Sequence, residues 1–295
     1  MNKEPLRKII LFPAAAAIVF ACNLPKPHAT ILPETSTETP QTTVHLLPGN
    51  KTILMLPTSA TPSATAVPTI DDFFVRCPTS DEIASVDKDL NLQFETDPTA
   101  GKTVCLGSSG SADLTAIQKR AYQSVLVMKQ LAFDAPLPWT NKTLYDWFIS
   151  AIKGIRFRGD IQNSYCCEPA GMIDIAIASN SYLLLTDRWV DPSLGGGLMD
   201  TMILFVHEAR HNEGFVHTCP DGASDKTIAE MGAWGVQYFL FLWIAQHGER
   251  PFLRAPGNDP NAYRRLALQD ALDTQRVRFC NEPTPTPGAA PTLAP

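Results

Sequence analysis

The chain lacks several features that would assign it to a common functional class. Its 24 lysines and arginines stand against 30 aspartates and glutamates, a net charge of −6, and the basic residues form no cluster. This pattern argues against nucleic acid or an anionic surface as a partner. Two apolar runs, 9–20 and 231–245, are shorter than the roughly 20 residues that span a bilayer. The second run therefore predicts a buried core helix.

No two cysteines have the C-x-x-C spacing that would indicate a cysteine metal site. An even set of six instead follows Cys22: Cys77, Cys105, Cys166, Cys167, Cys219 and Cys280. In an exported protein such a set indicates disulfides. Adjacent cysteines rarely suit a mutual bridge, so we expect Cys166 and Cys167 to pair separately with Cys219 and Cys280. Cys77 is then expected to pair with Cys105.

Aromatic residues are absent between positions 23 and 70, where proline and threonine dominate. Such a stretch buries too little apolar surface to offset the entropy lost on ordering. We therefore expect residues 22–70 to form a disordered tether. Residues 283–295 have the same composition and are expected to be a disordered tail.

The first 21 residues resemble a bacterial lipoprotein signal peptide. Lys3, Arg7 and Lys8 precede the first apolar run, which leads into Ala21 and Cys22. The resemblance implies cleavage before Cys22 and lipid attachment at that cysteine. The protein would then be extracytoplasmic and anchored to the bacterial cell membrane by its lipid. An ordinary signal peptide followed by a chance cysteine is the alternative.

Histidine is scarce, with six residues in the chain, yet three of them fall within residues 207–217, which read HEARHNEGFVH. On an α-helix His207 and His211 lie on one face, where both can bind one Zn²⁺. Gly214 suits a left-handed helix end, after which the chain can turn back and present His217 as a third ligand. Glu208 can then reach a zinc-bound water as general base without binding the metal.

The pattern H-E-x-x-H-x-x-G-x-x-H resembles that of the metzincin zinc peptidases. The resemblance implies His207, His211 and His217 as ligands, with Glu208 as general base. Metzincins also have a methionine turn beneath the metal, but the only methionine after the motif is Met231. We predict that Met231 lies within a helix. Glu230 offers a second model, since thermolysin-like zincins take their third ligand from a glutamate placed similarly; the combination of Gly214 with His217 favours His217.

The hydrophobic pattern predicts one α+β domain over residues 71–282. The expected architecture is zincin-like: a small mixed sheet with a β-hairpin, packed on the active-site helix, and further C-terminal helices. Expected helices begin at Ser111 or Asp113, Thr140, Asp200, Asp225 and Asn261. Expected strands are 155–158, 173–177 and 182–186, the last two joined by a turn at 179–181. The likeness to zincins makes 182–186 the edge strand that aligns a peptide.

These features predict zinc-dependent hydrolysis of peptide bonds outside the cytoplasm, with zinc-bound water as the nucleophile and a peptide or protein as substrate. Tyr165, Tyr182 and Tyr238 are candidate donors to the oxyanion. Arg210 lies on another helical face and is assigned no catalytic role. The alternative is a non-catalytic, disulfide-braced binding protein with a structural zinc, in which Glu208 would have no task.

Overall fold

The computed structural model describes residues 68–95, 103–105, 113–167, 169–177, 184, 186, 188–191, 196–283 and 293. They belong to the compact unit Pro62–Pro295. The predicted signal segment, Cys22, the tether up to residue 67 and nearly all of the predicted tail lie outside the described residues. So does Tyr182.

Threonines begin the early helices, because a threonine hydroxyl accepts one of the free N–H groups of a first turn. Such caps precede α2 (Ser80–Asp89), α3 (Ala116–Gln130) and α4 (Leu144–Ala151). At the start of α1 (Ile70–Val75), Thr69 instead donates its backbone N–H and its hydroxyl to Asp72. The predicted starts of α3 and α4 were wrong by a few residues. Thr115 caps α3, since residues 114–115 pair as strand β3. Thr143, rather than Thr140, caps α4.

The main sheet is small and mixed, with the strand order β1-β4-β6-β5. Strands β1 (Asn91–Phe94), β4 (Gly154–Arg158) and β6 (Met172–Ala176) are parallel, and β5 (Tyr165–Cys166) is antiparallel to β6. All five residues of β6 are buried, because it lies between two strands and beneath helices. A separate pair joins β2 (Thr103–Cys105) to β3 (Leu114–Thr115). The predicted α+β class with a small mixed sheet is confirmed.

The predicted hairpin has a different partner from the one expected. Strand β6 pairs with β5, which precedes it, in the register Tyr165 to Asp174 and Cys166 to Ile173. Of the stretch 182–186, the structure describes Leu184 and Thr186, and neither lies in a strand. The rest of that stretch and the turn at 179–181 lie outside the described residues. The strand at the sheet edge beside helix α6 is therefore β5.

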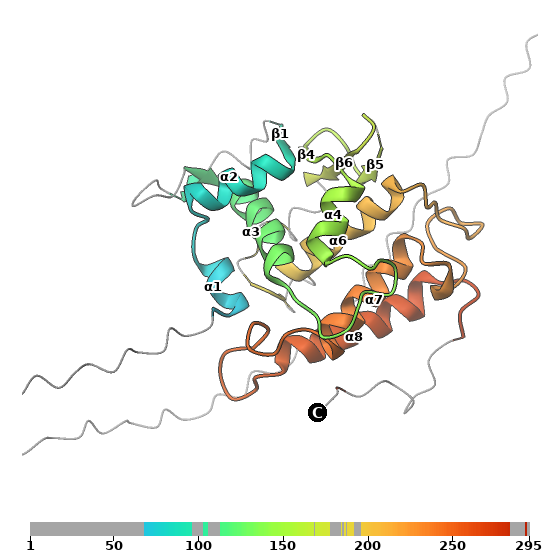
Figure 1. Cartoon of the computed structure of the whole chain (residues 1–295). Helices are drawn as coiled ribbons and strands as arrows, with labels where there is room; N and C mark the ends of the chain where they lie inside the picture. Colours follow the sequence, from blue (N-terminus) through green and yellow to red (C-terminus); the bar gives the residue numbers. More distant parts are fainter. Residues whose placement is uncertain are drawn as a thin grey trace, which may run out of the picture. The chain divides into compact units, whose positions relative to one another are not determined.

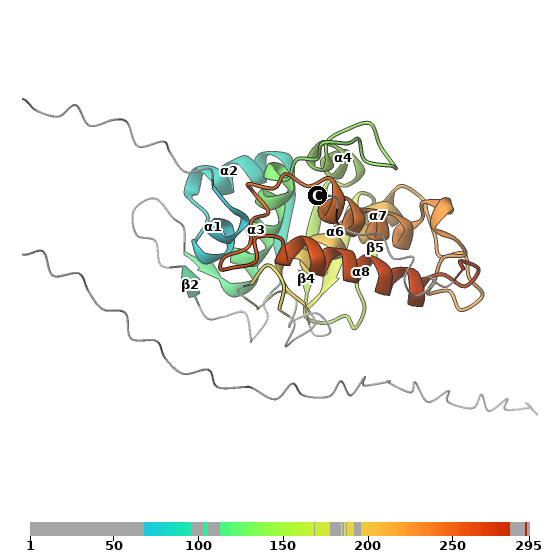
Figure 2. The same cartoon turned by 90° about the horizontal axis from the view of Figure 1, so that it is seen from below.

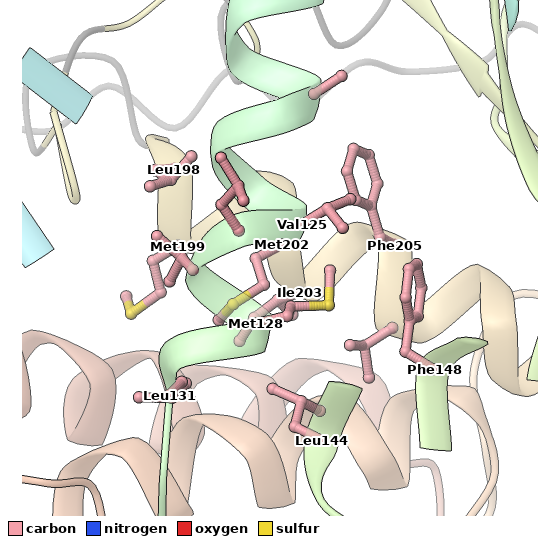
Figure 3. Packing of buried hydrophobic residues seen from close by; sticks show 14 of the residues in the cluster. Val125, Met128, Leu131, Leu144, Phe148, Leu198, Met199, Met202, Ile203 and Phe205 are labelled. Atoms are coloured by element: carbon pink, nitrogen blue, oxygen red, sulfur yellow. The ribbon is translucent and has the colours of Figure 1, made fainter. Parts of the chain in front are cut away.

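The central helix α6 (Leu198–Asn212) carries the motif into the core. Its apolar residues pack on α3 and α4, as Figure 3 shows for Met202, Ile203, Phe205 and their neighbours. Phe205 also meets Phe157 of β4 edge to face, with ring centroids 5.9 Å apart. This packing leaves only the C-terminal end of α6 to face a cleft, and that end carries the histidines.

The last two helices, α7 (Ala233–Gln246) and α8 (Ala262–Arg278), pack side by side, and α7 also packs on α6 (Figures 1 and 2). The predicted α8 is confirmed, with Asn261 at its N-cap. Helix α7 begins seven residues later than predicted, after the 3₁₀ turn η1 (Ile228–Glu230), with Gly232 rather than Asp225 at its N-cap. Among the described helices, none has the length and apolar character of a membrane span.

The disulfides agree with one prediction and correct the other. Cys77 pairs with Cys105 as expected. Cys219 pairs with Cys280, and the neighbours Cys166 and Cys167 pair with each other, so the separate partners predicted for them were wrong. The chain near Cys219 runs beside the end of α8: Asp225 N–H donates to Arg278 O, and Cys280 N–H donates to Asp225 O, both over 3.1 Å. These bonds place Cys280 within reach of Cys219. Cys166 and Cys167 then pair with each other.

Candidate metal centre

The three motif histidines converge at the end of α6. His207 and His211 come from its last two turns, and Gly214 then adopts a φ of +94°, the left-handed conformation predicted for it. The chain returns and brings His217 to the same point. Each histidine offers a ring nitrogen, and the three nitrogens lie within 4.8 Å of one another. This is the arrangement expected of a three-histidine metal site.

Two of the imidazoles are held through Nδ1. Nδ1 of His211 lies 2.6 Å from the carbonyl oxygen of Phe215, and Nδ1 of His217 lies 2.9 Å from Oδ1 of Asp225. An N–H at Nδ1 that donates to these oxygens leaves Nε2 as the free lone pair, which is the form a metal ligand needs. Nδ1 of His207 is buried and has no hydrogen bond of good geometry to a described residue, although the Gln237 side chain interacts with this ring.

Burial favours the neutral form of His207 and His211. Desolvation, together with repulsion from the other two imidazoles, holds the pKa of His207 well below its usual value. Burial also lowers the pKa of His211. Neutral imidazole is the form that binds a metal, so the site is prepared for a cation near neutral pH.

Asp225 ties the third histidine to helix α7. Its side chain is fully buried, and while Oδ1 faces His217, Oδ2 accepts the backbone N–H of Trp234 over 3.0 Å. Asp225 was predicted to cap this helix directly. It satisfies an N–H of the first turn instead from across η1, because α7 begins at Ala233 and the loop 226–232 folds back.

Met231 lies in a turn, which corrects its predicted place inside a helix. The residue follows η1 with a φ of +50°, a left-handed conformation, directly before α7. Nε of Arg210 donates to the Met231 carbonyl oxygen over 2.7 Å, and its Nη1 donates to Glu213 over the same distance. Arg210 also lies over the Phe215 ring at 3.5 Å. It thus holds both the turn and the loop after α6, and it does not line the cleft.

The indole ring of Trp234 packs against the histidines. The Trp234 ring lies 4.3 Å from the ring of His207 and stacks on that of His217 at 5.9 Å, centroid to centroid. Its indole N–H donates to the Ala223 carbonyl oxygen over 2.7 Å, which fixes the ring. The indole therefore packs directly against two of the three imidazoles.

Glu230, the rival third ligand, is engaged elsewhere. Its Oε2 accepts the Thr218 hydroxyl over 2.5 Å and the Lys226 N–H over 3.3 Å. The group of metal-ligating side chains found among the described residues consists of His207, His211 and His217. Of the two models, the geometry favours His217.

Glu208 is buried beside the histidines and lines the same cleft. Its Oε2 has no hydrogen-bond partner among the described residues. Burial raises the pKa of this carboxyl group to about 8. A buried carboxylate oxygen without a partner costs free energy unless it serves a ligand or a water molecule. Oε2 is thus positioned to contact a molecule in the cleft, and a cation held by the neighbouring histidines would lower this pKa and favour the carboxylate, the form that accepts a proton.

The cleft has a volume of about 910 Å³. Its lining comes from α6, α7, the end of α8, the loop after the motif and strand β5 with its neighbours: Asn163, Ser164, Tyr165, Cys166, Cys167, Leu204, His207, Glu208, His211, Gly214, Phe215, Val216, His217, Gly222, Ala223, Trp234, Gln237 and Arg278. Tyr165 lines it, but Arg158 donates to its hydroxyl over 2.7 Å. Tyr238, the third predicted oxyanion donor, is not among the lining residues.

Sequence reasoning did not identify Asp225, Trp234, Gln237 or Arg278 as residues of the site. Asp225 resembled a helix cap, and Trp234 and Gln237 lay in what reads as a core helix. Arg278 ends a helix where a basic residue is common. A signal existed only for Asp225, whose carboxylate stands eight residues after a predicted ligand.

Comparison with protein-family models, with curated proteins and with solved structures finds no match for this chain. The chemistry of the site therefore rests on its residues. Three converging imidazoles, two of them fixed through Nδ1, fit a zinc ion well, because zinc takes nitrogen ligands and a catalytic site commonly has three protein ligands.

Proposed function

We propose that this chain is a zinc-dependent, metzincin-like peptidase that cleaves peptide bonds outside the cytoplasm. His207, His211 and His217 would hold the zinc. When bound, the metal supplies Lewis acidity, which polarises a substrate carbonyl and lowers the pKa of water to about 7. The observation that carries the proposal is Oε2 of the buried Glu208, which no described residue hydrogen-bonds, beside three converging imidazoles.

Glu208 acts as the general base in this proposal. Its Oε2 takes a proton from the attacking water and later gives it to the amine that leaves. A structural zinc site has no need for such a group, and burying a carboxyl group with an oxygen that has no partner would only destabilise the fold. The unpartnered oxygen of Glu208 in the described part of the chain therefore favours a catalytic site over the non-catalytic binding protein.

Strand β5 is the proposed guide for the substrate. It is the terminal strand of the sheet in the described part of the chain, it contacts α6, and Tyr165 and Cys166 line the cleft. An extended peptide can add to such an edge through its backbone, which brings a peptide bond to the histidines. The turn at Met231, held by Arg210 of the motif, further supports the likeness to metzincins.

The proposal includes the location expected from the sequence. The lipoprotein-like signal and the proline-rich and threonine-rich tether would hold the domain at the outer face of a membrane through a lipid on Cys22. The disulfides Cys77–Cys105 and Cys219–Cys280 suit an oxidising compartment.

The test is zinc-dependent cleavage of a diverse peptide library, read by mass spectrometry. The purified chain should cleave when loaded with one zinc, lose this activity with a chelator and regain it when zinc is restored. A chain that holds zinc and leaves the whole library intact would contradict the proposal.

A further inference from the structure

A positively charged side chain lines the cleft beside the histidines. Arg278, the last residue of α8, is one of the cleft residues, and its guanidinium carbon lies 4.1 Å from the centroid of the Trp234 ring. The same indole packs against His207. A cation–π contact therefore holds the guanidinium next to the proposed metal centre.

Arg278 forms no ion pair with any described residue, in contrast to its neighbour in sequence. Arg276 pairs with Asp273 one turn earlier on the same helix. The acidic side chain whose charge acts on Arg278 is Asp221. That carboxylate accepts the N–H groups of Ala223 and Ser224 within its own turn, at 2.9 and 3.0 Å. No carboxylate of the cleft neutralises Arg278, since Glu208 is buried at the histidines.

The contacts that stabilise Arg278 do not use its hydrogen bonds. The indole face takes the charge, and the end of helix α8 favours a cation, but neither occupies the five N–H donors of a guanidinium. These donors can bind a carboxylate through two parallel hydrogen bonds. Arg278 is exposed, so these donors are open to a molecule in the cleft.

We propose that Arg278 binds a carboxylate group of the peptide substrate and so sets the specificity of the cleft; this inference rests on the proposed function. The substrates would be peptides that place a carboxylate near the scissile bond. Either a free C-terminal carboxylate or the side chain of an aspartate or glutamate supplies this chemistry. Arg278 is a specificity residue here and takes no part in the bond cleavage itself.

The test uses short peptide hydroxamates, because a hydroxamate chelates zinc and anchors every probe at the same point. Three series differ only at the far end, one to four residues from the hydroxamate: a free C-terminal carboxylate, an amidated C-terminus with an internal glutamate, and an amidated C-terminus with glutamine. Inhibition or direct binding is measured on the zinc-loaded full chain. The variants are Arg278→Met, which keeps the apolar stem over Trp234, Arg278→Lys, and Arg276→Met as the control.

The proposal expects a carboxylate probe to bind about tenfold or more tightly than its glutamine counterpart. Arg278→Met should remove this preference and leave the affinity for the glutamine probe unchanged, Arg278→Lys should keep part of it, and Arg276→Met should keep all of it. The series that shows the preference identifies which carboxylate is bound. Equal weakening of carboxylate and glutamine probes by Arg278→Met would reveal a purely structural role and overturn the proposal, as would probes with no preference.

The outcomes separate this inference from the proposed function. If the chain cleaves no peptide yet shows the preference that depends on Arg278, the carboxylate site stands and the peptidase function fails. If it cleaves peptides with no such preference, only the carboxylate site fails. If no hydroxamate binds the zinc-loaded chain, both fail.

Discussion

Nδ1 of His217 lies 2.9 Å from Oδ1 of Asp225, and the other oxygen of that carboxylate accepts the backbone N–H of Trp234. One buried side chain thus connects the third histidine to the start of α7. Carboxylate partners of this kind fix the tautomer of a metal-binding histidine and raise its basicity. Asp225 is therefore a positioning residue for the proposed zinc site.

Asp225→Asn should weaken zinc binding by roughly 10- to 100-fold, because the amide keeps the shape of the side chain but removes the charge behind His217. Titration of zinc against a competing chelator measures this. Asp221→Asn is the matched control, since Asp221 lies in the same loop, its carboxylate accepts the N–H groups of Ala223 and Ser224, and it acts on His217 through its charge alone. Equal zinc affinities for Asp225→Asn and the control would contradict the role given to Asp225.

His217→Ala should lower zinc affinity by several orders of magnitude, whereas Glu230→Ala should leave the zinc content of the purified protein unchanged. The reason is that His217 faces the other two imidazoles, while Glu230 accepts bonds from Thr218 and Lys226. Elemental analysis at equal protein concentration decides between them. Full zinc retention in His217→Ala would overturn this choice of ligand.

The local pattern of the sequence was enough to predict the parts of the site that lie within one helix and its end. His207 and His211 fall on one face of α6 by spacing alone, and Gly214 takes the left-handed conformation that its type suggests. The apolar alternation around Ile173 and Ile175 likewise predicted β6. These features depend on residues close in sequence, where periodicity and conformational preference decide the outcome.

Features that depend on distant residues were missed or misread. Asp225 has the appearance of a cap, but the loop that separates it from α7 turns back, so it reaches His217 as well. Met231 stands in an apolar run that resembles a helix, yet Arg210 binds its carbonyl and holds a turn there. The pairing of Cys219 with Cys280 follows from backbone bonds between Asp225 and the end of α8, and no spacing rule contains them.

Cys219→Ser combined with Cys280→Ser should destabilise the fold by about 2–4 kcal/mol, because the bridge closes a long loop in the unfolded chain. Cys219 and Cys280 are 61 positions apart in the sequence, and Cys219 lies two residues after His217. Without the bridge the segment that carries His217 is held less firmly, so zinc affinity should fall as well. Urea denaturation in zinc-free buffer isolates the first effect, and chelator competition measures the second. A double variant with unchanged unfolding free energy and unchanged zinc affinity would show that the bridge stabilises neither the fold nor the metal site.

The stability of the zinc-free fold should depend on pH through two partly buried carboxyl groups, Asp200 in α6 and Asp270 in α8. Burial raises the pKa of Asp200 to about 7, and burial together with the charge of Asp200 raises that of Asp270 to about 7. In the unfolded chain both aspartates have the usual pKa of 3.8. Above this pH the folded protein therefore keeps protons that the unfolded chain has released. The unfolding free energy should therefore fall as pH rises from about 4 to about 7.

Asp200→Asn should flatten part of this dependence. At pH 8 the variant should be more stable than the wild type by on the order of 1–2 kcal/mol, and at pH 4 the two should be equal. Urea denaturation across this range gives the comparison. Asp81→Asn, an exposed aspartate in the first turn of α2, is the control that should preserve the slope. A slope that Asp200→Asn leaves intact would rule out Asp200 as its source.

The peptidase account depends most directly on Glu208. The decisive measurement is the rate of peptide cleavage by Glu208→Gln and by the wild type, on samples shown to contain equal amounts of zinc. We expect the variant to keep its metal and to lose about 10²- to 10⁴-fold in turnover, because the amide cannot take a proton from water. A zinc-loaded Glu208→Gln protein that cleaves as fast as the wild type would contradict the account.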